Sequence, residues 1–412
     1  MRKLKQILVL TSLYPASDLP KENTPVVHYF TKEWVKMGYE VAVVHYPYNF
    51  PRLITIPLRP FSKYIAKVFG MAVIRTSQLT ECEYELDGVK VKRIPLKKYI
   101  PHGRYGRNEI CRAERKTLQW LKEINFKPDV ITGHWANPQV EMMRCLKNTL
   151  NVPCSLVLHN AGRDFKTIYR NETESLLSGI DLIGYRSDYI KKEVVREFHL
   201  EDKPNFLCRS GIPEEYVNSD AKGRNYNEIN SFIYVGTLIK RKYPAQIIPA
   251  ISKEFGDKDF SLTYIGTGEE ENRINIYASK YNVTDKVHIL GRLPRMQVVE
   301  QLKKSDVLIM ISKSETYGLV YLEMMAVGGI AIASRHEGFD GIIRDGYNGF
   351  LCEAGNSEEL SQIIHRIRRM NKEELKKISQ NAIATAQNLT DRNTAMLYVQ
   401  KLESVFIAHE KT

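Results

Sequence analysis

The sequence predicts an α/β protein built from two doubly wound parallel sheets, and three observations support this. Short apolar runs alternate with amphipathic helical stretches through most of the 412 residues. Many of the runs end in glycine, which places adaptable backbone at the strand ends where open α/β sheets bind ligands. A polar stretch at 210–230, with proline and two glycines, interrupts the rhythm and divides the chain.

Each element follows from its local pattern. Helices are expected at 27–37 and 112–124, between apolar runs of strand length. The expected domains are 1–212, which would bind the acceptor, and 213–392, which would bind a nucleotide-sugar. A last helix at 393–409 carries Met396, Leu397, Val399, Leu402 and Phe406 on one side, so residues 393–412 are expected to pack back on the first domain. The expected strands are 6–12, 40–46, 129–135, 154–160 and 181–187 in the first half, and 232–236, 262–266, 287–291, 307–312 and 330–334 in the second.

The net charge of +12 is unevenly distributed. Residues 1–212 hold 34 basic and 22 acidic side chains, whereas residues 213–412 hold 26 of each. Residues 52–127 alone contribute 17 basic against 7 acidic. A uniformly basic nucleic-acid coat is therefore disfavoured, and the two halves are expected to face different partners.

Other classes of protein are excluded by simple patterns. No apolar run approaches the roughly 18–20 residues that cross a bilayer. The six cysteines show no C-x-x-C pair and no regular spacing, so neither a disulfide framework nor a zinc site is indicated. These patterns predict a globular protein of the reducing cytoplasm.

The densest functional pattern is "SKSETYGLVYLEMMAVGG" at 312–329. A strand ends, a loop carries Glu315, and a helix begins near Gly318. Helix N-termini bind phosphate, and glycine lets a ligand approach the backbone. Glu323 lies in a helix that is otherwise almost entirely apolar, so its carboxylate needs a partner. That partner is either a structural lysine or ligand hydroxyls such as a ribose diol.

This segment resembles the E-x7-E motif of the family 4 retaining glycosyltransferases, with Glu315 and Glu323 as the two acids. That family has the GT-B fold, two Rossmann-like domains facing across a cleft. Similar family segments are found at 234–244, 262–271, 286–293 and 338–360. The resemblance is specific over about 231–360 and looser in the first half.

The resemblance implies roles for individual positions. Glu323 would bind the nucleotide ribose, and Glu315 the hydroxyls of the donor sugar. Lys242 would contact phosphate, while Thr237 stands where the family usually has arginine, and Arg241 or Lys240 are the alternatives for the missing cation. The remaining expected donor contacts are the backbone of Tyr317, Gly318 and Leu319 and the strand-end glycines Gly236, Gly266 and Gly291.

In the first half, His134 ends a strand where the family often has a histidine near the donor sugar and its phosphate. With Glu315 and Lys242, it is one of the three residues that the resemblance implies to be catalytic. A structural role at the strand end is the alternative. His159 is a weaker candidate, and Asp164 is weaker still. No cofactor and no metal are expected, because the "DKD" at 257–259 is interpreted as a surface turn. Lys242 and helix N–H groups would then neutralise the leaving diphosphate.

The basic excess of the first half suggests a membrane surface. Residues 61–74 have helical apolar spacing with basic flanks, typical of an interfacial segment. An ordinary core-facing helix with a solvated basic face is the alternative. Our hypothesis is that this half docks peripherally on the inner face of an anionic membrane and accepts a lipid-linked sugar. The basic residues assigned to this acceptor side are Arg59, Lys63, Lys67, Arg104 and Arg107.

The sequence thus favours a retaining, metal-independent glycosyltransferase of polysaccharide biosynthesis. It would move a sugar from a UDP- or GDP-linked donor to a glycan or lipid-linked acceptor. A GT-B-fold UDP-sugar 2-epimerase is the alternative enzyme, although it shares the architecture and not the E-x7-E tail. A nucleic-acid-binding protein is disfavoured because no recognisable readout module is present.

Overall fold

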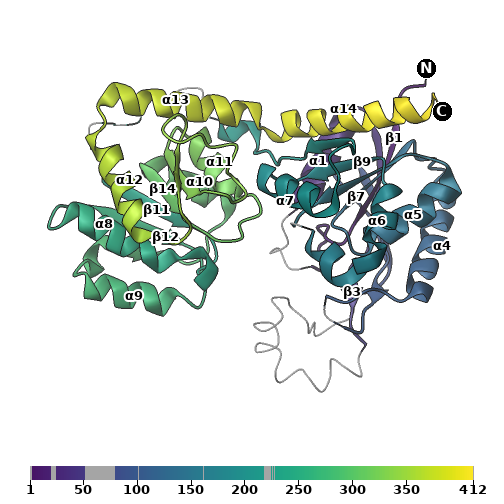
Figure 1. Ribbon diagram of the computed structural model, residues 1–412, viewed down its shortest axis with the longest axis horizontal. Coiled ribbons are helices and arrows are strands. Elements are labelled where there is room, and N and C mark those ends of the chain that lie inside the picture. Colours follow the sequence, from purple (N-terminus) through teal and green to yellow (C-terminus); the bar gives the residue numbers. More distant parts are fainter. Residues whose placement is uncertain are drawn as a thin grey trace. The chain divides into compact units, whose positions relative to one another are not determined.

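The computed structural model describes residues 2–19, 25–51, 79–100, 102–160, 162–217, 224, 226 and 228–411. They form two compact units (Figure 1). Unit 1 comprises Met1–Arg186, Ile190–Cys208 and Ala395–Thr412, and unit 2 comprises Ser187–Tyr189 and Arg209–Thr394. Each unit is built on a mainly parallel sheet with helices, so the predicted α/β doubly wound class is confirmed.

Unit 1 contains an eight-stranded sheet of order β10-β9-β8-β7-β1-β2-β5-β4. All neighbours are parallel except β4 and β5. The five strands predicted for this half are confirmed as β1, β2, β7, β8 and β9. The strands are β1 (Gln6–Thr11), β2 (Glu40–His45), β4 (Cys82–Leu86), β5 (Val89–Arg93), β7 (Val130–His134), β8 (Cys154–Leu158), β9 (Leu182–Tyr185) and β10 (Asn205–Leu207), and a separate pair joins β3 (Tyr48–Asn49) to β6 (Leu96–Lys97).

The helices that accompany this sheet include both predicted ones. The helix expected at 112–124 begins earlier, at Arg107. The residues before Ile110, its first buried side chain, are polar, so the apolar pattern did not reveal this start. The helices are α1 (Val26–Lys36), α4 (Arg107–Glu123), α5 (Gln139–Leu150), α6 (Thr173–Ser178), α7 (Asp188–Phe198) and α14 (Asp391–His409), with a π-helical turn at Phe165–Tyr169 and a 3-10 turn at Arg170–Glu172.

The antiparallel pair β4–β5 was not predicted, and its chemistry explains why. Exposed and half-buried side chains alternate along β4, so it lacks the apolar run of a buried parallel strand. Cross-strand ion pairs hold its surface instead, for example Lys92 with Glu83 at 2.9 Å. A strand of this kind can be predicted only together with the strand that pairs with it, and not from its own composition.

Unit 2 contains a six-stranded, wholly parallel sheet of order β13-β12-β11-β14-β15-β16. All five predicted strands are confirmed, and only the short β16 was missed. The strands are β11 (Ser231–Val235), β12 (Ser261–Ile265), β13 (Val287–Ile289), β14 (Val307–Met310), β15 (Ile330–Ser334) and β16 (Phe350–Cys352). The helices are α8 (Ile247–Phe255), α9 (Glu271–Lys280), α10 (Arg295–Lys304), α11 (Leu319–Ala326), α12 (Ser357–Arg369) and α13 (Lys372–Asn388), with 3-10 turns at Glu214–Tyr216, Lys240–Lys242, Pro244–Gln246 and Thr284–Lys286.

The last helix, α14, runs along unit 1 from Ala395 onward (Figure 1). Trp34 donates its indole N–H to the carbonyl of Ala395 at 2.9 Å, and Tyr398 is fully enclosed. The expected apolar face was partly wrong, because Met396 and Leu397 are 41% and 54% exposed. The side chains that it buries are Ala395, Tyr398, Val399, Leu402 and Phe406.

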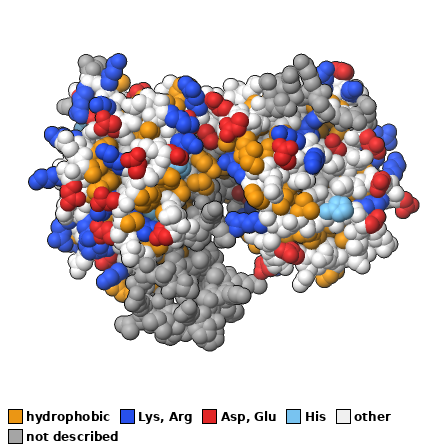
Figure 2. Space-filling view, turned by 180° about the vertical axis from the view of Figure 1, so that it is seen from behind, with side chains coloured by type: hydrophobic (Ala, Val, Ile, Leu, Met, Phe, Trp, Pro, Cys, Tyr) orange, Lys and Arg blue, Asp and Glu red, His pale blue; other side chains and the backbone are white. Residues whose placement is uncertain are grey.

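The surface carries both signs of charge. Figure 2 shows basic and acidic side chains interspersed over the visible face of each unit. Within the described part of the chain, no helix combines the length and apolarity that a membrane crossing requires.

Candidate functional site

The carboxyl edge of the unit 2 sheet brings three predicted glycines together. Gly236 follows β11, Gly266 follows β12, and Gly291 follows β13 after one further residue. The N–H of Gly236 donates to the carbonyl of Ile265 at 2.9 Å, and the N–H of Gly266 to that of Gly291 at 2.7 Å. Since parallel strands all end at this edge, the glycines line one continuous strip of backbone.

Gly266 is the position in this strip that tolerates no side chain. Its φ of +143° lies in the region that favours glycine. A Cβ there would lie 1.9 Å from the carbonyl oxygen of Gly236. The two strand ends therefore approach each other closely, as the sequence pattern of strand followed by glycine predicts.

The N-terminus of α11 follows β14 at the same edge. Gly318 caps the helix with a φ of +82° and contributes no side-chain hydrogen bond. Tyr317 is buried and donates its hydroxyl to the carbonyl of Ser210 at 2.7 Å, which fixes its side chain within unit 2. The N–H of Tyr321 donates to the carbonyl of Gly318 at 3.1 Å, whereas the N–H groups of Leu319 and Val320 precede the first helical hydrogen bond and favour an anion. Phosphate binding by this backbone remains a prediction.

Lys242 and Glu315, expected as catalytic groups, form an ion pair. The Lys242 Nζ lies 3.1 Å from the Glu315 Oε2, and the two side chains are only 13% and 14% exposed. Lys242 ends the 3-10 turn Lys240–Lys242, and Glu315 lies in the loop before α11. The structure thus joins two side chains that are 73 positions apart, each as the counter-charge of the other.

Arg241, an alternative for the missing cation, holds the neighbouring loop. Its Nη1 donates to the carbonyls of Lys313 and Ser314, both at 3.1 Å. The Lys313 N–H donates back to the Arg241 carbonyl at 2.8 Å. Lys240 and Thr237 are exposed. The choice between Arg241 and Lys240 therefore stays open, and Arg241 has a positioning role that sequence reasoning missed.

Glu337 is a second residue that sequence reasoning missed. Its Oε2 accepts the backbone N–H of Glu315 at 2.8 Å, which fixes the loop behind that residue. Burial raises the pKa of Glu337 above its usual range, although backbone N–H groups oppose the shift. Its position directly before the family segment at 338–360 is the only sequence signal that could have identified it.

Glu323 has found a structural partner, and that partner is an arginine. The Glu323 Oε1 accepts from Arg295 Nε at 2.9 Å and lies 2.8 Å from Arg295 Nη2. Glu323 is 6% exposed, while the Arg295 guanidinium carbon lies 5.1 Å from the ring centroid of Tyr216. Both contacts with Arg295 end on Oε1. The Oε2 atom therefore keeps the acceptor capacity that a diol requires.

In unit 1, His134 lies at the carboxyl end of β7, and its expected contact with the donor stays a prediction. Its side chain is fully buried, and rings of Phe30, Trp135 and Tyr398 surround it. Burial, with the nearby charge of Arg186, lowers its pKa to about 3, so the imidazole is neutral. The side chain at the carboxyl end of β7 is thus packed among aromatic rings in the structure without a ligand.

His159, the weaker candidate, occupies the accessible position instead. Its Nε2 lies 3.0 Å from His134 Nδ1, and its ring stacks on Trp135 with centroids 4.0 Å apart. The side chain is partly exposed, and it follows β8 at the carboxyl edge of the sheet. Asp164 is also partly exposed, and burial raises its pKa despite the nearby Lys98.

The basic residues of the predicted acceptor side differ in their state. Arg104 is bound by two carboxylates, those of Glu141 at 2.8 Å and Glu172 at 2.5 Å, so it is not a free surface cation. Arg107 is exposed at the first position of α4. Arg59, Lys63 and Lys67, with the predicted helix 61–74, lie outside the described residues.

The structure offers little for metal chemistry in its described part. The "DKD" triplet is exposed in the turn between α8 and β12. Among the described residues, no group of three or more His, Cys, Asp or Glu side chains could hold a metal ion. The six cysteines are free thiols.

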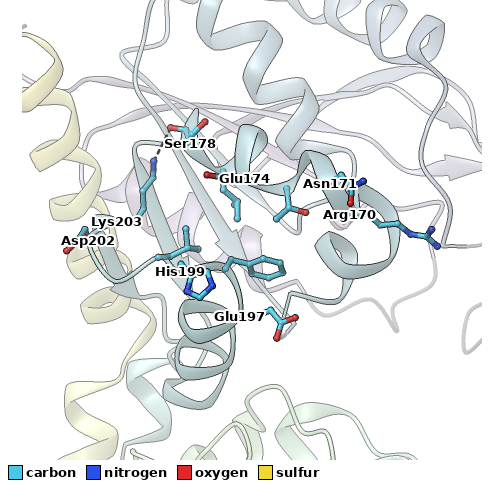
Figure 3. A pocket seen from close by; sticks show the side chains of 12 residues that line it. Arg170, Asn171, Glu174, Ser178, Glu197, His199, Asp202 and Lys203 are labelled. Carbon is cyan, nitrogen blue, oxygen red and sulfur yellow. Dashed lines mark hydrogen bonds between the residues drawn. The ribbon is translucent and has the colours of Figure 1, made fainter.

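A pocket of about 630 Å³ in unit 1 is lined by none of the residues predicted to act (Figure 3). It is lined by α6, the end of α7 and the residues that lead into β10, where Lys203 donates to the carbonyl of Ser178 at 3.0 Å. Because α6 and α7 end where β9 and β10 begin, the pocket lies at the amino edge of the sheet. Ligands of open α/β sheets bind at the opposite edge.

Comparison with known proteins adds independent findings. A family model described as "Glycosyl transferases group 1" matches residues 217–385. The chain is similar to an uncharacterized glycosyltransferase of Methanocaldococcus jannaschii, 30% identical over 255 residues, which are 60% of this chain and 67% of that protein. It is also similar to the lipopolysaccharide core biosynthesis glycosyltransferase LpsE of Rhizobium meliloti, 29% identical over 133 residues, 32% of this chain and 38% of that protein.

The fold has relatives among solved structures. One is described as "Trehalose-6-phosphate from E. coli bound with UDP-2-fluoro glucose". The TM-score is 0.69 at 12% identity, covering 97% of this chain and 99% of that chain. At this identity the likeness concerns the fold alone.

Proposed function

The chain belongs to the glycosyl transferases group 1 and has the GT-B fold, and on this premise we propose that it moves a sugar from a nucleoside-diphosphate sugar to a glycan or lipid-linked acceptor, with retention of configuration. A single observation carries the proposal. At the carboxyl edge of the unit 2 sheet, the N-terminus of α11, whose cap Gly318 supplies no side-chain hydrogen bond, lies between two acids, Glu315 before it and Glu323 within it. This arrangement would supply a site for an anion, with a carboxylate on each side that can accept hydrogen bonds from hydroxyl groups.

The leaving diphosphate would be the group that this edge stabilises. N–H groups at the start of α11 point out of the helix, and the helix dipole favours negative charge there. Lys242 adds a positive charge whose counter-ion in the structure is Glu315, at 3.1 Å. When the sugar–phosphate bond breaks, charge accumulates on the diphosphate oxygens, and preorganised donors of this kind lower the barrier.

The two acids would recognise hydroxyl groups. Arg295 fixes the orientation of Glu323 through Oε1, so Oε2 can accept from a ribose diol. The Glu315 loop is held by Glu337 and Arg241 at its backbone, so its carboxylate can accept from the donor sugar without reorganisation. In unit 1, His134 remains the proposed contact with the sugar or its phosphate, and His159, whose Nε2 lies 3.0 Å from His134 Nδ1, is the weaker candidate.

Polysaccharide or lipopolysaccharide biosynthesis is the process that this activity would serve. One similar protein carries lipopolysaccharide core biosynthesis in its name. The basic excess of residues 52–127 supports peripheral association with an anionic membrane, where such acceptors reside. The pairing of Arg104 with Glu141 and Glu172 reduces this support.

The experiment compares donors in a thermal-shift panel and then analyses products. UDP- and GDP-sugars are tested first without acceptor, because a ligand that binds the native state raises Tm. Glu323→Gln should abolish the shift and lower kcat/KM by at least about tenfold, or about 1.4 kcal/mol. Activity should persist with a chelator present. An epimerised donor formed without acceptor, or a Glu323→Gln variant with normal binding and turnover, would contradict the proposal.

A further inference from the structure

A second pocket of unit 1, also about 630 Å³, lies between α4 and α5. The two helices contribute residues at the same helical spacing, which places each set of three on one face. Arg104 and Tyr105, from the segment before α4, complete the lining. The six helical lining residues are Arg107, Ile110 and Cys111 from α4 and Glu141, Arg144 and Cys145 from α5.

The inner charges of this pocket compensate one another. Arg104 donates from Nε and Nη2 to Glu141 Oε1 at 3.0 and 2.8 Å, and from Nη1 to Glu172 Oε1 at 2.5 Å. Glu141 is only 7% exposed, and its Oε2 accepts from the hydroxyl of Tyr169 at 3.3 Å. Arg104 is therefore a rigid part of the wall, and it neutralises the acids that could otherwise repel an anion.

The outer charges are two exposed arginines, Arg107 and Arg144. Neither forms an ion pair or hydrogen bond with another of the described residues. The lining residues hold three guanidinium groups and one carboxylate, that of Glu141, while Glu172 and Glu114 lie nearby. Because Arg104 is already bound by Glu141 and Glu172, Arg107 and Arg144 are the lining cations that can meet an anion. Arg107 is also the first residue of α4, whose cap Gly106 has no side chain to satisfy the N–H groups of the first turn.

The pocket lies on the side of unit 1 that carries His159. Helix α5 begins just after the carboxyl end of β7. The side chain of Asn137, in the loop between them, donates to the carbonyl of Gly103 at 3.0 Å. The segment that leads into α4 is thereby attached to the carboxyl edge of the sheet, where α/β proteins bind substrates.

We propose that this pocket binds a phosphate or diphosphate group of the acceptor, held by the guanidinium forks of Arg107 and Arg144. Arginine recognises phosphate by paired N–H donors, and the two side chains reach the mouth from different helices. Ile110 and Tyr105, each only 5% exposed, line the inner wall of the pocket. The inference rests on the proposed function, because it names the chemical class of that acceptor.

The pocket provides its own reporter, since Cys111 is exposed and Cys145 is half-buried. The rate of N-ethylmaleimide labelling at each cysteine is measured by peptide mass spectrometry, with and without inorganic pyrophosphate and with no donor present. At about ten times its Kd, pyrophosphate should slow labelling of Cys111 and Cys145 about tenfold. Cys82, in β4, should label at an unchanged rate.

Matched variants separate the site from general charge. The double variant Arg107→Gln/Arg144→Gln should lose the protection. Lys122→Gln/Lys127→Gln, which removes two exposed positive charges near the other end of α4, should keep it. Vesicles of phosphatidic acid and of phosphatidylcholine form the second arm. The proposal would be overturned by equal protection in both double variants or by absence of protection by pyrophosphate. It would also be overturned if only the acidic vesicles protected the cysteines, because the anion would then be a bilayer headgroup.

Failure of this inference is distinguishable from failure of the proposed function. The labelling assay contains no donor, so absence of protection leaves the transferase proposal intact. Conversely, a chain without transfer activity that still shows arginine-dependent protection would retain the phosphate pocket and lose the assigned reaction.

Discussion

Removal of the Lys242 ammonium should lower both stability and activity. A double variant that also removes the charge of Glu315 separates the effect on stability from the effect on activity. At 3.1 Å and an effective dielectric constant of about 20, the attraction between Lys242 and Glu315 amounts to roughly 5 kcal/mol before desolvation. Both side chains are about seven-eighths enclosed, at 13% and 14% exposure. Lys242→Met would therefore leave a nearly buried carboxylate uncompensated, at a cost of about 3 kcal/mol.

The double variant Lys242→Met/Glu315→Gln removes both charges and should recover most of that stability, to within about 1 kcal/mol of the natural chain. Scanning calorimetry measures this as a Tm loss of roughly 6–12 °C in the single variant and a few degrees in the double. All three tryptophans, Trp34, Trp120 and Trp135, lie in unit 1. Their fluorescence therefore follows the unit that the substitutions do not touch.

Catalytic turnover, unlike stability, should not recover in the double variant. Both variants lack the cation proposed to stabilise the leaving diphosphate, so kcat/KM should fall at least about tenfold in each. Recovery of stability without recovery of activity is the expected result. If the double variant regained turnover together with Tm, the pair would be structural and the catalytic assignment of Lys242 would be refuted.

Two further predictions concern unit 1. His134 has a pKa of about 3 in the folded chain, below the unfolded value of about 6.5, so its contribution is present above pH 6.5 and is lost as the pH falls toward 3. Between pH 7 and pH 5, the free energy of unfolding of the natural chain should fall by about 2 kcal/mol more than that of His134→Asn. Urea unfolding followed by tryptophan fluorescence measures this difference, and equal losses in the two chains would contradict the prediction. If the protein associates peripherally with a membrane, it should sediment with anionic vesicles. The affinity for the vesicles should fall at least about tenfold in Lys63→Glu/Lys67→Glu and less in the control Lys122→Glu, since each basic residue near such a surface contributes about 1 kcal/mol. Binding insensitive to both salt and the reversals would exclude it.

The elements that the sequence predicted are those whose own residues determine their structure. Buried parallel strands such as β1 and β14 are continuous apolar runs, so composition alone identifies them. The pair β4–β5 escaped because its alternating pattern depends on a partner strand. Likewise, Met396 and Leu397 had the apolarity of a buried face, but the surface of unit 1 covers Ala395 and Tyr398 instead. Which face of a helix is buried depends on what it packs against.

The sequence by itself determined the two α/β sheets, the glycines at their carboxyl edge and the pair of acids around α11, because strand length, backbone freedom and helix N-termini are local properties. Only the tertiary structure decided which charges meet. It paired Lys242 with Glu315 and Glu323 with Arg295, and it enclosed His134 while leaving His159 accessible. These outcomes depend on contacts between segments distant in the chain, where burial and Coulomb attraction act on side chains that no local pattern connects.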